Sequence, residues 1–157
     1  MLKVIGDGGH TKVVRDVIAA MTQISGTHFI AVGNNESRKK EAELNAGGYF
    51  AVLIHPRAYV APNAILGEGT IVMAGAVIQP EARIGKHVIV NTGATVDHEC
   101  LIGDFAHIAP GAHLCGCVEV GEGALVGVGA VAIPGAKIPA WSLVKAGSVA
   151  KCKIPIR

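Results

Sequence analysis

Residues 59–148 divide into fifteen consecutive six-residue blocks with no insertion: YVAPNA, ILGEGT, IVMAGA, VIQPEA, RIGKHV, IVNTGA, TVDHEC, LIGDFA, HIAPGA, HLCGCV, EVGEGA, LVGVGA, VAIPGA, KIPAWS and LVKAGS. The second position is Val, Ile or Leu in fourteen blocks, and Ala132 is the exception. The sixth position is always small or β-branched and is Ala in nine blocks. A fixed period of this kind is the sequence signature of a repeat architecture.

Each block predicts one short strand followed by one corner. The sixth position of a block and the second position of the next are two residues apart, so in a strand these apolar residues share the inward face. The first position lies between them and points outward, while positions three to five, rich in Gly, Pro and Asn, turn the chain. Three sides close a triangular prism, so one coil takes eighteen residues and the ninety residues make about five coils. We therefore expect a mainly β protein whose coils bury one another's apolar rows.

The composition of the 157 residues excludes several classes of protein. Half of the residues are hydrophobic and 17% are charged, which argues against disorder. A net charge of +2 with a pI near 8.4 is too weak to favour nucleic acid as a partner. A membrane-spanning helix needs about 20 consecutive apolar residues, and none is found, so no membrane insertion is expected. The N-terminus lacks the apolar stretch of an export signal and the four cysteines follow no disulfide or zinc spacing, which predicts a cytoplasmic protein.

Residues 1–55 follow a different pattern, which predicts a small β-α-β-α-β unit. Strands are expected at residues 2–5, 28–32 and 50–54, and helices at residues 11–21 and 36–46. The glycine turn at residues 6–10 (GDGGH) joins the first strand to the first helix, so its backbone N–H groups favour a phosphate. The third glycine of the dinucleotide fingerprint is missing, so a sugar nucleotide is favoured over a nicotinamide dinucleotide. The alternative is that these glycines only permit a tight turn.

Four segments of the chain resemble one family. They are GDGGHTKVVRDVI (residues 6–18), AVGNNESRKK (residues 31–40), LIHPRAYVAPNA (residues 53–64) and NTGATVDHECLIGDFAHIAPGA (residues 91–112). They are similar to segments of the left-handed parallel β-helix acyltransferases, in particular the bacterial sialic-acid O-acetyltransferases and the UDP-4-amino-sugar N-acetyltransferases of glycan and exopolysaccharide biosynthesis. The resemblance implies a left-handed coil, a homotrimer, acetyl-CoA as cosubstrate and no metal.

The resemblance also implies the domain organisation. Residues 1–55 would form a small Rossmann-like α/β domain for a sugar nucleotide, residues 56–148 the β-helix acyltransferase domain and residues 149–157 a C-terminal tail. Family members usually carry a second strand ending in acidic residues that hold the uridine, followed by a further helix. Here only residues 22–27 separate the first expected helix from the next strand, so the α/β domain is shortened.

His98 is the first candidate for chemistry. It is the fourth residue of TVDHEC, so it lies at a corner and faces outward, flanked by Asp97 and Glu99. A nearby carboxylate stabilises imidazolium and makes the histidine a stronger base. Gly116 follows eighteen residues later at the same corner, where its N–H can polarise an acetyl carbonyl. The resemblance implies that His98 is the catalytic base and that Glu99 raises its basicity; the alternative is a solvated corner histidine.

His107 is the first residue of HIAPGA and points outward from a strand, half a coil after His98, so the two can meet only across a subunit boundary. A threefold assembly would also cover outward apolar residues such as Ile71, Leu101 and Leu125. The resemblance places acetyl-CoA between subunits of a trimer and implies that His107, Gly116, Val128 and Ala146 bind it. For the substrate, the resemblance implies His10, and the glycine turn adds Gly8 and Gly9 as expected binding residues.

The expected function is acetyl transfer from acetyl-CoA to an amino group or a hydroxyl of a nucleotide-activated or free sugar, through a direct ternary complex with no enzyme nucleophile. Two alternatives come from other classes. A zinc protein similar to the γ-class carbonic anhydrases would need a His pair five residues apart, whereas His107 and His113 are six apart and start on different prism faces. The second alternative is a non-catalytic solenoid scaffold.

Overall fold

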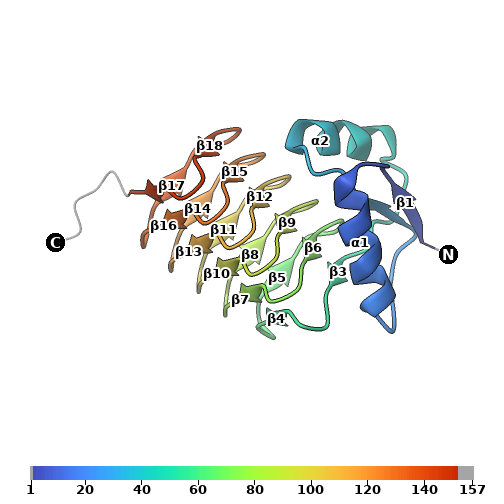
Figure 1. Cartoon of the computed structure of the whole chain (residues 1–157), viewed down its shortest axis with the longest axis horizontal. Coiled ribbons are helices and arrows are strands. Elements are labelled where there is room, and N and C mark those ends of the chain that lie inside the picture. The colour runs from blue at the N-terminus through green and yellow to red at the C-terminus, as the bar shows by residue number, and fades with distance from the viewer. Residues whose placement is uncertain (1, 152–157) are drawn as a thin grey trace.

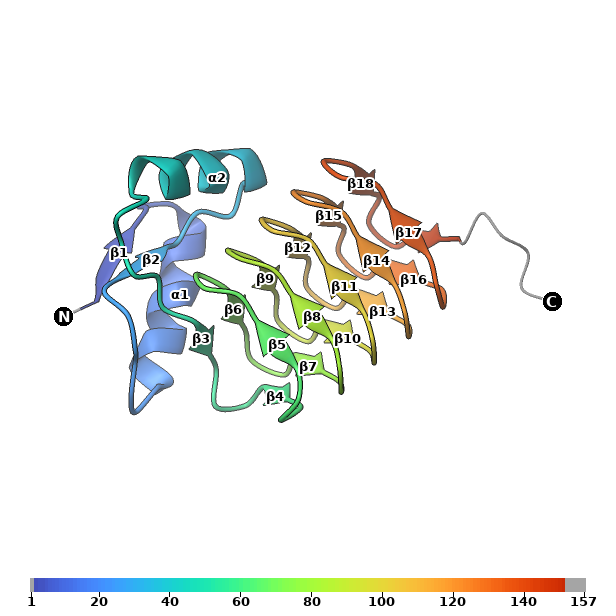
Figure 2. The ribbon, with the colours of Figure 1, turned by 180° about the vertical axis from the view of Figure 1, so that it is seen from behind.

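The computed structural model describes residues 2–151. A small α/β unit at the N-terminal end leads into a parallel β-helix (Figure 1). The α/β unit contains β1 (Lys3–Ile5), α1 (Gly9–Ala20), β2 (His28–Ile30) and α2 (Asn35–Leu44), and β1 pairs with β2 in parallel. α1 lies at the N-terminal end of the β-helix, whereas α2 lies over its coils in both views (Figure 2) and reaches the later ones, where Asn35 donates to the Gly123 carbonyl and Lys39 pairs with Glu122.

The β-helix has three faces, and each face is a parallel sheet. Face 1 contains β3 (Leu53–Ile54), β6 (Ile71–Val72), β9 (Ile89–Val90), β12 (His107–Ile108), β15 (Leu125–Val126) and β18 (Leu143–Val144). Face 2 contains β4 (Tyr59–Val60), β7 (Val77–Ile78), β10 (Thr95–Val96), β13 (His113–Leu114), β16 (Val131–Ala132) and β19 (Val149–Ala150). Face 3 contains β5 (Ile65–Leu66), β8 (Arg83–Ile84), β11 (Leu101–Ile102), β14 (Glu119–Val120) and β17 (Lys137–Ile138).

The strand register confirms the predicted coil of eighteen residues. Thr95 pairs with His113, and His113 pairs with Val131, each eighteen residues further along the chain. The fifth position of most blocks has a positive φ, which glycine adopts at no steric cost. Within residues 2–151, six residues other than glycine take this conformation at corners: Glu81, His87, Glu99, Phe105, Cys117 and Trp141.

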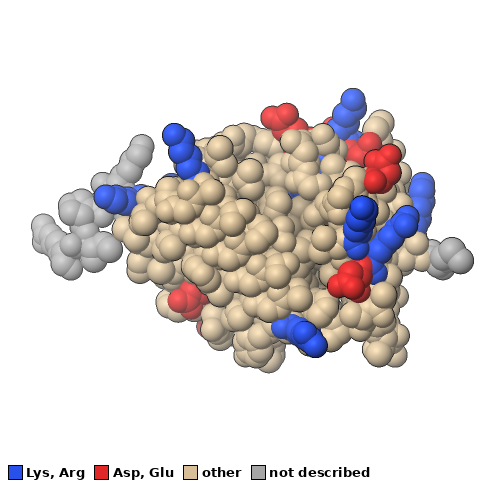
Figure 3. Space-filling model, in the orientation of Figure 1, with Lys and Arg blue, Asp and Glu red and all other residues tan. Residues whose placement is uncertain are grey.

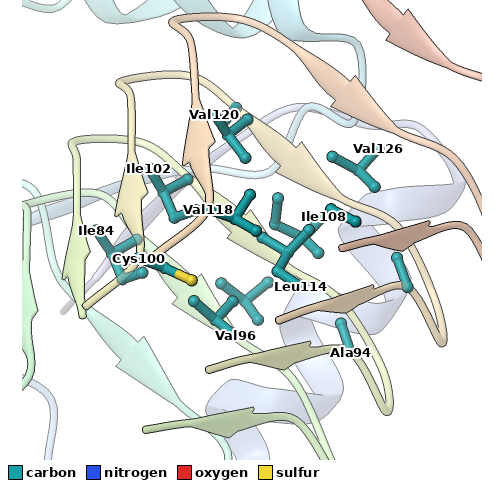
Figure 4. Close-up of a cluster of buried hydrophobic side chains, with 14 of the residues drawn as sticks. Ile84, Ala94, Val96, Cys100, Ile102, Ile108, Leu114, Val118, Val120 and Val126 are labelled. Carbon is teal, nitrogen blue, oxygen red and sulfur yellow. The ribbon is translucent and has the colours of Figure 1, made fainter. Parts of the chain in front are cut away.

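The interior of the prism is filled by the short and branched side chains of positions two and six (Figure 4). Val96, Ile102 and Leu114 are at most 4% exposed, and they pack with alanines such as Ala94. Full burial of one such Val, Ile or Leu side chain contributes about 1.5–3 kcal/mol. No aromatic side chain belongs to the interior cluster of the described residues, in keeping with the aromatic content of 4%.

The α/β unit packs on the N-terminal part of face 1. Val14 and Val17 of α1 are buried against Ile71, Met73 and Ile89. Ile71 is 1% exposed within the chain. The expectation that a neighbouring subunit covers Ile71 is therefore wrong, because the chain's own first helix does so.

Two predicted boundaries also differ from the structure. The strand expected at residues 50–54 belongs to the β-helix, because β3 pairs with β6, and only Phe50 forms a bridge to His28 of the α/β unit. A short apolar run does not reveal which of two parallel sheets it joins. At the other end, β19 pairs with β16, so the β-helix extends past residue 148. Residues 152–157 of the predicted tail lie outside the described residues.

Charged side chains are unevenly distributed over the surface. Figure 3 shows a broad area of the β-helix without them, whereas they gather at the end formed by the α/β unit. The outward positions of face 2 hold no Asp, Glu, Lys or Arg: they are Tyr59, Val77, Thr95, His113, Val131 and Val149. Neither helix of the described range has the length and apolar character needed to cross a membrane.

Candidate active site

His98 lies at the corner between β10 and β11, where face 2 meets face 3, which we name edge 2–3. Its Nδ1 is 2.9 Å from Oε2 of Glu99, and the two side chains are 54% and 57% exposed. The backbone N–H of His98 donates to Asp97 Oδ1. Because a carboxylate can only accept, Glu99 holds the proton on Nδ1 and leaves the lone pair of Nε2 free. This is the arrangement of an oriented general base.

Gly116 stacks on the same edge one coil along. A Cβ at this position would lie 2.5 Å from Cε1 and Nε2 of His98, so the bare Cα leaves the space that the imidazole ring occupies. Gly116 is the only glycine at the fourth position of the fifteen blocks. No hydrogen bond within residues 2–151 uses its backbone N–H. A donor without a partner beside a base is what an oxyanion site requires.

Cys117 shares this edge with the pair. Its backbone N–H donates to the carbonyl of His98, and its Sγ lies 3.8 Å from Glu99 Oε2. Desolvation raises the pKa of the Cys117 thiol, and the Glu99 carboxylate raises it further. A thiol held in its protonated form is a poor nucleophile, which argues against an acyl-cysteine intermediate.

His107 lies on β12 with both ring nitrogens engaged within the chain. Asn91 Oδ1 accepts from the backbone N–H of Thr92, which fixes the amide so that Nδ2 donates to His107 Nε2 over 3.0 Å. His107 in turn hydrogen-bonds the backbone carbonyl of Gly33, so its proton is on Nδ1. Burial, with the charges of Arg38 and His10 as smaller causes, lowers the pKa of His107 to about 3.

The environment of His107 corrects one expectation. The sequence places this side chain on a flat side open to a neighbouring subunit, whereas the α/β unit of the same chain reaches over it through Gly33. The local repeat pattern does not record where the α/β unit packs. His107 and His113 start on face 1 and face 2, as their six-residue spacing predicts, and His113 Nδ1 is hydrogen-bonded to Thr95.

His10 comes from the first turn of α1 and lies near His107. A Cβ on Gly33 would be 3.6 Å from Cβ and Cγ of His10, an ordinary van der Waals distance, so the loop passes close to this side chain. Burial lowers the pKa of His10, and the charge of Arg38 lowers it further. Its Nε2 is buried without a hydrogen-bond partner. The structure therefore brings together one residue predicted for the substrate and one predicted for acetyl-CoA.

The glycine turn beside His10 leaves open space. Gly6 has a φ of +122°, and a Cβ there would be 2.8 Å from the carbonyl oxygen of Ala31, so the turn needs this glycine. A Cβ at Gly8 or Gly9 would meet nothing within 4 Å, and neither has a positive φ. Packing therefore does not require Gly8 and Gly9, which argues against the interpretation that they serve only the turn.

Arg38 is a buried residue that the sequence analysis missed. It is 1% exposed, and its guanidinium donates to backbone carbonyls of the α/β unit and of the β-helix, including those of Gly33, His87 and Phe105. None of the ion pairs within residues 2–151 includes it. Burial lowers the pKa of Arg38 to about 9, so it stays charged at neutral pH. In the sequence it belongs to a charged helix, and no local signal separates it from the neighbouring Lys39 and Lys40.

Val128 and Ala146 lie exposed on a different edge, where face 1 meets face 2, which we name edge 1–2. They stack on each other through the hydrogen bond from Gly147 N–H to the Val128 carbonyl. Within one chain, face 2 separates them from the edge that carries His98 and Gly116. The predicted acetyl-CoA residues are thus divided between edge 2–3 with Gly116, edge 1–2 with Val128 and Ala146, and face 1 with His107.

Known bacterial proteins share the sequence repeat and the fold of this chain. Residues 63–98 match the family described as bacterial transferase hexapeptide (six repeats). The acetyltransferase domain of PglB from Neisseria gonorrhoeae FA1090 is 38% identical, with a TM-score of 0.89 over 98% of this chain and 92% of that chain. This chain belongs to the hexapeptide-repeat family of bacterial sugar acetyltransferases.

Two further relatives of this hexapeptide-repeat chain carry information about ligands. The PglB domain in complex with acetyl coenzyme A is 36% identical, with a TM-score of 0.86 over 96% of this chain and 92% of that chain. PerB from Caulobacter crescentus, in complex with CoA and GDP-perosamine, is 35% identical. Its TM-score is 0.88 over 94% of this chain and 87% of that chain.

A curated relative is UDP-N-acetylbacillosamine N-acetyltransferase from Bacillus subtilis (strain 168). It is 42% identical over 108 residues, which cover 45% of this chain and 50% of that protein. The match therefore spans half the length of that relative.

Proposed function

We propose that this protein transfers the acetyl group of acetyl-CoA to an amino group of a nucleotide-activated sugar. The observation that carries the proposal is the His98–Glu99 pair, which lies beside the free N–H of Gly116 on an exposed edge. Support comes from the relatives, since one is described with acetyl coenzyme A and another with CoA and GDP-perosamine. An amino group is favoured over a hydroxyl because the curated relative is named an N-acetyltransferase.

The proposed reaction is a direct transfer. The acceptor nitrogen attacks the acetyl carbonyl carbon while Nε2 of His98 takes its proton, and the carbonyl electron pair moves to oxygen. The N–H of Gly116 donates to this oxyanion, and Glu99 stabilises the imidazolium. When the tetrahedral intermediate collapses, the C–S bond breaks and the departing CoA thiolate takes the proton from His98. The products are the amide and CoA, and His98 is again neutral.

We propose that acetyl-CoA binds between subunits of a homotrimer. If the uncharged face 2 of three chains meets at a threefold axis, edge 2–3 of each subunit comes to lie against edge 1–2 of its neighbour. That contact joins His98 and Gly116 of one subunit to Val128 and Ala146 of another. Face 1, which carries His107, borders edge 1–2 and would then flank the same groove.

The α/β unit is the proposed binding site for the acceptor. Gly8 and Gly9 leave open space at the N-terminus of α1, where backbone N–H groups favour a phosphate. His10, with an unpartnered buried Nε2, adds a polar atom beside that space. We interpret the unit as a shortened Rossmann-like domain that holds the sugar nucleotide of a cytoplasmic pathway of glycan assembly.

Release of CoA with a set of matched acceptors tests the proposal. The set contains nucleotide-activated 4-amino sugars, the same nucleotide sugars with a hydroxyl in place of the amine, free sialic acid and free serine. We expect thiol release only with the amino sugars, together with an acetylated product by mass spectrometry. Release with hydroxyl acceptors alone would contradict N-acetylation, and release with none of them would contradict the transferase.

A further inference from the structure

Edge 2–3 brings three metal-binding side chains together. Nδ1 of His98 lies 2.9 Å from Oε2 of Glu99, and Sγ of Cys117 lies 3.8 Å from the same oxygen. One ligand atom from each residue lies within 4.8 Å of the other two, and residues 2–151 contain no second group of this kind. Cys117 is a free cysteine and has no part in the proposed acetyl transfer. That reaction therefore does not explain why its thiol lies beside His98 and Glu99.

The spacing of these atoms fits a single small cation. Tetrahedral Zn²⁺ binds nitrogen at about 2.0–2.1 Å, oxygen at about 2.0–2.2 Å and sulfur at about 2.3 Å, so its ligand atoms lie roughly 3.3–3.7 Å apart. The separations of 2.9 and 3.8 Å from Glu99 Oε2 differ from this range by a few tenths of an ångström, and the third pair, His98 and Cys117, lies within 4.8 Å. All three residues are exposed, so small side-chain rotations can make the adjustment.

The backbone already holds the three residues in place. His98 and Glu99 are neighbours in one coil, and the N–H of Cys117 donates to the His98 carbonyl over 3.0 Å, which fixes the next coil directly above. Binding therefore requires no rearrangement of the fold. A thiolate, an imidazole and a carboxylate form a donor set that suits zinc and similar thiophilic ions, whereas Mg²⁺ and Ca²⁺ prefer oxygen alone.

We infer that His98, Glu99 and Cys117 form a site for a thiophilic divalent cation such as Zn²⁺, and that the bound ion inhibits acetyl transfer. The prediction that the bound ion inhibits acetyl transfer rests on the proposed function of His98. On binding, the Cys117 thiol releases its proton to solvent and sulfur bonds to the metal. Nδ1 of His98 gives its lone pair to the metal, so the ring proton moves to Nε2. The ring then has no free lone pair with which to accept a proton from the acceptor.

Cobalt provides a direct readout, because a thiolate bound to Co²⁺ gives a charge-transfer band in the near ultraviolet. Untagged full-length protein is titrated with CoCl₂ as wild type, as Cys117→Ser and as the matched control Cys115→Ser. We expect the band at one ion per chain in the wild type and in Cys115→Ser, displacement by ZnCl₂, and loss of the band in Cys117→Ser. No band, or a band that survives in Cys117→Ser, would overturn the site.

The inhibitory half is tested by CoA release in the presence of ZnCl₂. We expect the concentration that halves the rate to be at least tenfold higher for Cys117→Ser than for wild type or Cys115→Ser, and a chelator to restore the rate. Equal inhibition of the three proteins would overturn the prediction that the bound ion inhibits through this site. If the protein binds Co²⁺ through Cys117 but releases no CoA with any acceptor, the metal site stands and the proposed transferase function fails.

Discussion

Arg38 and His107 donate hydrogen bonds to the same carbonyl, that of Gly33. The first comes from a helix of the α/β unit and the second from a strand of the β-helix, so a single loop residue joins the two parts of the molecule. The guanidinium also places a positive charge near His107 and His10, which adds to the effect of burial in lowering the pKa of both imidazoles.

Replacing Arg38 with Met should destabilise the protein. The variant leaves the carbonyls of His87, Val32 and Phe105 without this donor, and each such group costs about 1–3 kcal/mol. We expect the free energy of unfolding, measured by urea denaturation, to fall by at least about 3 kcal/mol. Lys40→Met on the exposed side of the same helix is the control and should change it by less than about 0.5 kcal/mol. Equal stability of the two variants would contradict the role of Arg38.

The stability of the protein should depend on the protonation of His87. This ring is 5% exposed and lies stacked on Phe105 and edge-on to Phe50. Burial lowers the pKa of His87 to about 4 from the ordinary histidine value of about 6.5. Below pH 6.5 the His87 imidazole binds a proton in the unfolded chain but stays neutral in the folded chain. The free energy of unfolding therefore decreases as the pH falls from 6.5 toward 4.

A pH series of urea denaturations measures this loss. The shift in the pKa of His87 corresponds to about 3 kcal/mol across that interval. His87→Leu lacks the titrating imidazole. We therefore expect its free energy of unfolding to change less steeply with pH between 6.5 and 4 than that of the wild type, whatever the absolute stability of the variant. Identical slopes for wild type and variant would show that His87 is not buried in its neutral form.

Gly116→Ala should separate activity from stability. Other coils carry Ala at the equivalent corner position, as at Ala74 and Ala140, so the backbone tolerates a Cβ there. The added Cβ would nevertheless collide with the imidazole of His98 and push the exposed ring away. We expect a melting temperature within a few degrees of wild type and a turnover number reduced by about 10²-fold, because the displaced imidazole is misplaced for proton transfer. If the variant has normal turnover, the space left by Gly116 is not needed to position the imidazole ring of His98.

The sequence predicted the parts of the site that depend only on the repeat. The eighteen-residue period placed Gly116 on the same edge as His98, and the alternation of strand residues placed His107 and His113 on different faces. The features that it missed depend on packing between distant segments. Nothing in AVGNNESRKK indicates that Arg38 is buried, because burial follows from how α2 lies against corners some 50–70 residues further along the chain. The left hand of the coil stays a prediction of the family resemblance.

Coexpression of two inactive variants tests whether the site is shared between subunits. His98→Ala removes the base from edge 2–3, and Val128→Arg blocks edge 1–2. In each mixed trimer, one of the three interfaces joins an intact edge 2–3 to an intact edge 1–2, and random mixing that also forms the two homotrimers gives about a quarter of all interfaces. We expect CoA release to recover to roughly that fraction of the wild-type rate. Mixed protein that stays inactive, although mass spectrometry shows mixed trimers, would place the whole site within one chain.

The turnover number of His98→Ala at saturating acetyl-CoA and amino-sugar acceptor tests the central claim most directly. The control is Lys137→Met, which alters an exposed side chain on face 3, away from the proposed threefold contact, and circular dichroism verifies that both proteins keep the fold. The proposal predicts a loss of about 10²–10⁴ for His98→Ala and little change for Lys137→Met, because a positioned general base contributes that factor. A His98→Ala variant that releases CoA at the wild-type rate would contradict it.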